Sequence, residues 1–129
     1  MEEKNQGHEE IIKGVREQFQ EILDGSKQAI YIYLDDNHKL CNQKFANLLG
    51  YASEDEWSGV QKPFTEAFVH ENSQESLVGT YQKAIEDKVG SEVEITWKKK
   101  DDGEVKTKVI LVPISYKDET IALHFIEEI

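Results

Sequence analysis

The chain of 129 residues is 38% hydrophobic and 32% charged, which suits one folded domain and argues against a disordered polypeptide. Its 26 acidic and 15 basic residues give a net charge of -11, which disfavours nucleic acid and membrane surfaces as partners. The single cysteine, Cys41, excludes an internal disulfide or a multi-cysteine zinc site, and the lack of a signal peptide or a run of ~20 apolar residues predicts a cytoplasmic protein.

Residues 9–23 are predicted to form an amphipathic helix, with residues 1–23 as an N-terminal helical segment. Its apolar stripe consists of Ile12, Val15, Phe19 and Ile22. Asp24-Gly25-Ser26 marks the end of the helix. Two interpretations stay open. The stripe pairs with a second protomer, together with the outer face of the sheet, to form a homodimer, or it only covers the domain's own sheet.

The next segment is predicted to be a β-hairpin followed by a short helix. β-Branched and aromatic residues over 29–34 and a short run over 38–41 flank a turn at 35–37. Residues 43–49 then place Phe45, Leu48 and Leu49 on one helical face, and Gly50 ends that helix.

The second half of the chain contains short helices, one longer helix and three strands. Residues 52–73 are irregular, and residues 74–88 have helical spacing. Alternating apolar residues predict strands over 91–99, 104–115 and 120–127. Strands on both sides of a helical block predict an α+β fold, an antiparallel sheet of five strands with helices on one face.

Three local motifs, together with this order of predicted helices and strands, resemble those of a known protein family. The stretch Asn42-Gln43-Lys44-Phe45-Ala46-Asn47-Leu48-Leu49-Gly50-Tyr51 resembles the strand-to-helix junction of PAS domains. Phe68-Val69-His70 resembles their apolar segment ending in histidine, although Glu71 replaces the usual proline, and Asp101-Asp102-Gly103-Glu104 resembles their charged hairpin. The resemblance covers residues 24–129 and implies the PAS fold, preceded here by the N-terminal amphipathic helix.

The resemblance implies a sensory or regulatory domain in signal transduction that binds a small organic ligand in its core, dimerises and acts on an effector protein. The alternative is a ligand-free PAS module for protein–protein interaction. Alternation and helical spacing predict the residues that line the core or cavity: Ile30, Ile32, Phe45, Leu49, Tyr81, Val109, Leu111, Leu123 and Phe125.

The sequence contains no catalytic motif, so it predicts no enzyme activity. The cofactor is unknown, but haem is disfavoured because residues 74–88 lack a histidine, and flavin because no Asn-Cys-Arg-Phe motif is present. Cys41, His70 and His124 are interpreted as structural, and paired acidic residues as solvated charge rather than a metal site.

Overall fold

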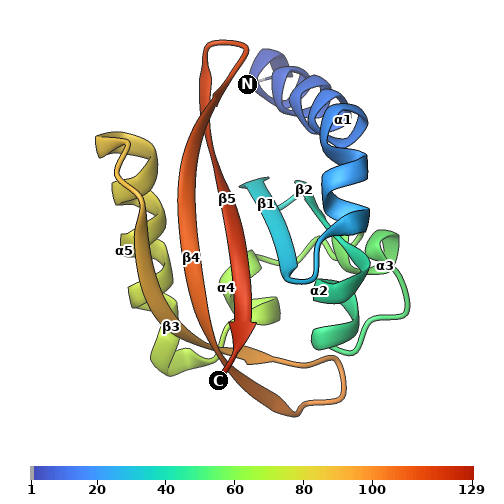
Figure 1. Cartoon of the computed structure of the whole chain (residues 1–129), viewed down its shortest axis with the longest axis vertical. Helices are drawn as coiled ribbons and strands as arrows, with labels where there is room; N and C mark the ends of the chain where they lie inside the picture. Colours follow the sequence, from blue (N-terminus) through green and yellow to red (C-terminus); the bar gives the residue numbers. More distant parts are fainter. Residues whose placement is uncertain (1) are drawn as a thin grey trace.

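The computed structural model describes residues 2–129, with side chains from residue 7 onward. Five strands form one antiparallel sheet in the order β2-β1-β5-β4-β3, which confirms the predicted sheet (Figure 1). The strands are β1 (Ala29–Asp35), β2 (His38–Cys41), β3 (Ser91–Lys98), β4 (Glu104–Tyr116) and β5 (Glu119–Glu128). Their ends lie within one residue of the predicted ends.

Five helices accompany the sheet: α1 (Glu2–Gly25), α2 (Gln43–Leu48), α3 (Glu54–Ser58), α4 (Phe64–Phe68) and α5 (Glu71–Asp87). Gly50 ends α2 as predicted, with a φ of 85° that favours glycine. α5 begins three residues before its predicted start, because the side chain of His70 accepts a hydrogen bond from the backbone of Asn72 and caps the helix. None of the helices among the described residues has the length and apolar character needed to cross a bilayer.

The inner face of the sheet packs against α2–α5 around an aromatic core. Trp57 and Trp97 are fully buried, and their rings pack edge to face against Phe45 at centroid distances of 5.3 Å. Thr107 accepts a hydrogen bond from the indole of Trp97 at 2.8 Å, so the polar atom of that ring is satisfied inside the core. The core therefore holds the helical block firmly on this face.

The outer face of the sheet is partly covered by α1, on the side opposite α5 (Figure 1). Ile11, Val15 and Leu23 of α1 are buried against this face. The helices α2–α5 thus lie on one face of the sheet as predicted, and the preceding amphipathic helix α1 lies on the other.

Most of the predicted dimer stripe lies against the domain's own sheet. Val15 is fully buried in the chain's own core, and Ile12 and Phe19 pack against the same cluster, whereas Ile22 is 59% exposed. Leu23, which follows Ile22, takes the inward position because the stripe of a straight α-helix drifts around its axis. As long as α1 lies here, Val15 is inaccessible to a second protomer.

A close approach between α1 and the β4–β5 hairpin fixes the position of the helix. The hydroxyl group of Tyr116 lies against Gly14, where a Cβ atom would collide with it. Tyr116 packs against the buried residues between α1 and the sheet, which we call the outer cluster: Ile11, Val15, Leu23, Ile30, Ile32, Leu40 and Ile121. Glycine at this position therefore lets the hairpin and the helix touch.

Candidate functional site

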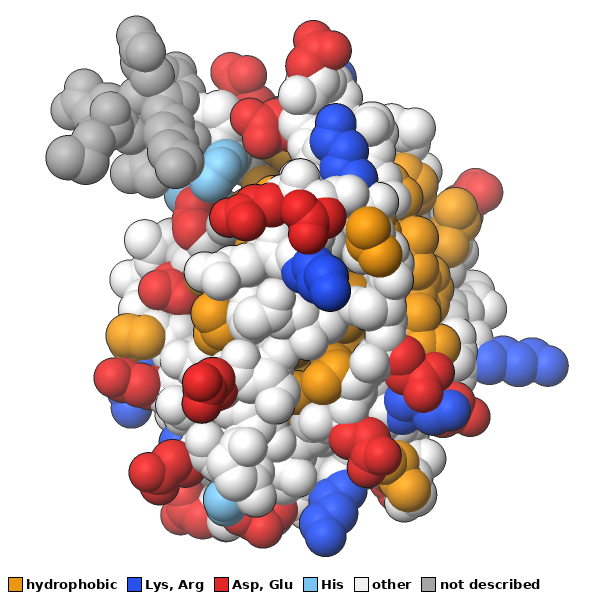
Figure 2. Space-filling view, turned by 90° about the vertical axis from the view of Figure 1, so that its left-hand side faces the viewer, with side chains coloured by type: hydrophobic (Ala, Val, Ile, Leu, Met, Phe, Trp, Pro, Cys, Tyr) orange, Lys and Arg blue, Asp and Glu red, His pale blue; other side chains and the backbone are white. Residues whose placement is uncertain are grey.

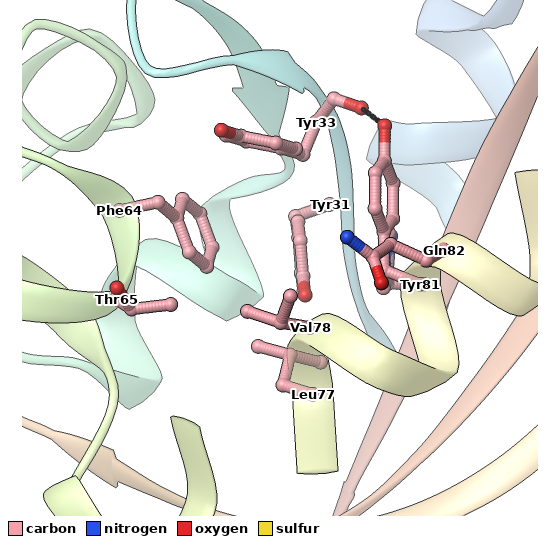
Figure 3. A pocket seen from close by; sticks show the side chains of 9 residues that line it. Tyr31, Tyr33, Phe64, Thr65, Leu77, Val78, Tyr81 and Gln82 are labelled. Atoms are coloured by element: carbon pink, nitrogen blue, oxygen red, sulfur yellow. Dashed lines mark hydrogen bonds between the residues drawn. The ribbon is translucent and has the colours of Figure 1, made fainter. Parts of the chain in front are cut away.

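A pocket of about 220 Å³ lies between α4, α5 and the inner face of the sheet. β1 contributes two tyrosines, while the helices supply the opposite wall (Figure 3). β5 contributes a histidine. The lining residues are Tyr31, Tyr33, Phe64, Thr65, Leu77, Val78, Tyr81, Gln82 and His124. Most of these side chains present ring or aliphatic surface, so the pocket suits an apolar or aromatic molecule.

His124 supplies the most distinctive polar group of the pocket. Its ring stacks on Tyr31 with a centroid distance of 4.0 Å and an interplanar angle of 12°. Burial lowers the pKa of His124 to about 3, so the ring is neutral at physiological pH. Its Nδ1 atom is buried and has no hydrogen-bond partner among the described residues. An unpaired buried nitrogen is energetically costly.

The hydroxyl groups of Tyr81 and Tyr33, in contrast, are already engaged. Tyr81 donates to the carbonyl of Tyr33 at 3.1 Å (Figure 3), and Tyr33 donates to Asp36 at 3.0 Å. Burial raises the pKa of Tyr81 to about 12, and burial together with Asp36 raises the pKa of Tyr33 further, so both phenols stay protonated. These bonds hold the rings in place, so the walls of the pocket are largely formed before a ligand enters.

The volume of the pocket limits the size of a guest. A cavity of ~150 Å³ accommodates benzene, and sites for drug-sized ligands occupy ~300–1,000 Å³. At about 220 Å³ the pocket matches a molecule of one or two rings. Stacking against tyrosine and burial of apolar surface are the interactions that this arrangement offers.

Five of the predicted cavity residues lie on the inner side of the sheet: Phe45, Leu49, Tyr81, Val109 and Leu111. Of these, Tyr81 lines the pocket, and the other four are core residues outside its lining. Their part in ligand binding remains a prediction.

The other four predicted residues lie on the outer face of the sheet, where Ile30 and Ile32 are buried core residues but none of the four lines the pocket. Ile30 and Ile32 belong to the outer cluster beneath α1, and Leu123 and Phe125 pack against it. The side chains of a strand alternate between the two faces of the sheet. An error of one residue in the predicted register therefore moves every predicted side chain of that strand to the opposite face. Tyr31, Tyr33 and His124 take the inner positions instead.

The sequence signal for these residues was weak, because both faces of β1 carry large apolar side chains. One usable indication was present in β5, where His124 alternates with Leu123 and Phe125 and therefore points to the opposite face. Phe64, Thr65 and Val78 come from helices whose docking angle the sequence does not specify. Cys41 is a buried core residue, and burial raises the pKa of its thiol, which keeps it protonated and unreactive.

Comparison with solved structures gives many similar folds, whereas no family model and no curated protein sequence matches the chain. The PAS domain of a protein from Colwellia psychrerythraea is 19% identical with a TM-score of 0.66, covering 89% of this chain and 97% of that chain. The PAS domain of an HTR-like protein from Haloarcula marismortui is 18% identical with a TM-score of 0.61, covering 96% and 99%. A PAS domain from a two-component sensor histidine kinase is 10% identical with a TM-score of 0.65, covering 91% and 99%.

Proposed function

Since the chain has the PAS fold, we propose that it is a sensory domain in signal transduction whose signal is a small aromatic molecule bound in the pocket. The observation that carries this proposal is the pocket of about 220 Å³ itself, whose lining consists mainly of aromatic and aliphatic side chains. The ring of a ligand in this pocket would lie against the tyrosine rings.

Occupancy of the pocket would act on α1 through the sheet. Tyr31 and Tyr33 line the pocket, and Ile30 and Ile32 of the same strand hold α1 on the opposite face. A ligand that shifts the tyrosines therefore changes the surface on which α1 rests. A small shift of β1 would then favour a second position of α1.

The test is a thermal-shift and calorimetric titration with indole, phenol and toluene, which are aromatic molecules of one or two rings. We expect at least one of these probes to bind saturably and to raise Tm by about 4 °C at roughly ten times Kd. Val78 is 42% exposed and lines the pocket, so Val78→Trp is expected to fill the cavity and abolish binding.

Val89→Trp provides the matched control, because Val89 is 47% exposed and outside the lining of the pocket. It should bind the probes as the wild type does. If no probe binds, and the protein purified without denaturation carries no small molecule, the proposal fails. The chain is then better described as a ligand-free module for protein–protein interaction.

We further propose that the partner of the uncovered outer face is a second copy of the chain. Ile110 and Val112 of β4 pair with Phe125 and Leu123 of β5, and Val112 is 36% exposed. Ile22 of α1 is 59% exposed. Figure 2 shows hydrophobic side chains gathered along its right-hand edge, and surface of this kind is typical of protein interfaces.

Light scattering after size exclusion tests this dimer. We expect Val112→Lys to raise the dimer Kd about 10-fold or more, because a lysine would be placed in an apolar interface. Val78→Lys, which places the same charge on α5 at the pocket, should leave the dimer unchanged. A wild type that is monomeric at high micromolar concentration would refute this part of the proposal.

A further inference from the structure

Two histidines and one aspartate meet where α1 lies against the β1–β2 hairpin. The Nδ1 atom of His8 lies 2.6 Å from Oδ2 of Asp35, and the Nδ1 atom of His38 lies 2.8 Å from Oδ1 of the same carboxylate. The two imidazole rings are 6.1 Å apart and nearly perpendicular. Their side chains are only 15% and 16% exposed, so the cluster is shielded from solvent on most sides.

We propose that His8, Asp35 and His38 form a binding site for one divalent transition-metal ion, with zinc as the reference ion. One ligand atom from each residue lies within 4.8 Å of the other two. Zinc bonds of ~2.0–2.2 Å to nitrogen and oxygen place the ligand atoms of a tetrahedral site about 3.3–3.5 Å apart. Small rotations of the side chains convert the present hydrogen-bonded arrangement into that geometry, and a water molecule takes the fourth position.

The chemical type of the ligands and the fixed orientation of the carboxylate support a transition metal. Two imidazoles and one carboxylate suit zinc, nickel or copper, whereas calcium and magnesium prefer oxygen ligands alone. The carboxylate is already oriented, because Asp35 also accepts a hydrogen bond from the backbone of Asn37 at 2.9 Å. The chain's net charge of -11 further favours the approach of a cation.

The sequence alone does not indicate this site, because His8 and Asp35 are 27 residues apart and meet only when α1 docks on the sheet. Bound metal would tie α1 to the hairpin near the N-terminal end of the helix. The apolar contacts of Ile11, Val15 and Leu23 hold the remainder of the helix. Metal occupancy would therefore stabilise the docked position of α1, a response separate from ligand binding in the aromatic pocket.

The test uses the full chain without an affinity tag, freed of metal with a chelator and titrated calorimetrically with zinc chloride. We expect one ion per chain and a higher Tm in zinc, with no response to calcium or magnesium. His8→Gln and His38→Gln retain an N–H group that can donate to Asp35 but remove an imidazole ligand. Each is expected to weaken zinc binding by roughly 100-fold and to abolish the rise in Tm.

His70→Asn is the matched control, since His70 also contacts a carboxylate, at 2.8 Å from Glu104, and asparagine retains a capping side chain for α5. This variant should bind zinc as the wild type does. Cobalt gives a second readout, because its visible absorption bands should appear with the wild type and not with either glutamine variant. A wild type that binds no zinc, or folded glutamine variants that bind it equally well, would overturn the proposal.

Discussion

Replacing Asn42 with alanine is expected to lower the free energy of unfolding by about 3–5 kcal/mol. The side chain is 1% exposed and makes four hydrogen bonds. Its oxygen accepts from the backbone N–H groups of Ile30 and Phe45, both at 3.1 Å. Its amide nitrogen donates to the carbonyls of Leu23 and Gln28 at 3.1 and 2.9 Å. Alanine would leave several buried backbone groups without partners, and each unpaired group costs about 1–3 kcal/mol.

Urea unfolding followed by tryptophan fluorescence measures this effect, because Trp57 and Trp97 are fully buried and report on loss of the core. Asn47→Ala is the matched control on the same helix, since Asn47 is exposed, and it should change stability by no more than about 0.5 kcal/mol. Asn42→Asp should also destabilise the fold, because a carboxylate oxygen would face the carbonyls of Leu23 and Gln28. Equal stabilities of Asn42→Ala and Asn47→Ala would contradict this account.

Asn42 also illustrates how far the sequence predicts the fold. An asparagine before an apolar helical stretch predicts a helix cap, and the structure contains that cap, from Asn42 to Phe45. Its bonds to Leu23 and Gln28 depend on where α1 ends relative to the hairpin, which is a tertiary feature without a local pattern. The elements could therefore be predicted, whereas the bonds that join them could not.

The sheet shows the same limit in its choice of faces. The spacing of apolar residues along the chain predicts the five strands, because each strand continues without interruption for at least four residues. In β1, however, Ile30 and Ile32 alternate with Tyr31 and Tyr33, and both faces of the strand are covered because α1 packs on the second face. A strand with two apolar faces carries no signal for which face meets which helix. The candidate site was accordingly predicted only in part.

Lys39 is a second feature that no periodic pattern could predict. It is 2% exposed, yet its ammonium group donates to the backbone carbonyls of Asp36, Ser58 and Val60 at 2.5, 3.2 and 2.7 Å. Burial lowers its pKa, and the three carbonyls together with nearby aromatic rings compensate for the lost hydration. This contact joins β2 to the loop after α3, and it exists only when both segments are in place.

Acidification is expected to destabilise the protein through His124 by about 2–3 kcal/mol between pH 6.5 and pH 4.5. In the unfolded chain this histidine has the ordinary pKa of ~6.5, and in the folded protein burial lowers the pKa to about 3. Between these values the unfolded state binds more protons than the folded state. The contribution of neutral, buried His124 to the free energy of unfolding is therefore fully present above pH ~6.5 and is lost progressively as the pH falls toward 3.

The measurement compares urea unfolding of the wild type and of His124→Phe at pH 7 and pH 4.5. Phenylalanine retains a flat ring to stack on Tyr31 but binds no proton, so titration of other groups cancels in the difference between the two proteins. The wild type should lose about 2–3 kcal/mol more than the variant on acidification. Parallel losses would mean that His124 is solvated or protonated in the folded protein, which would contradict its burial against Tyr31.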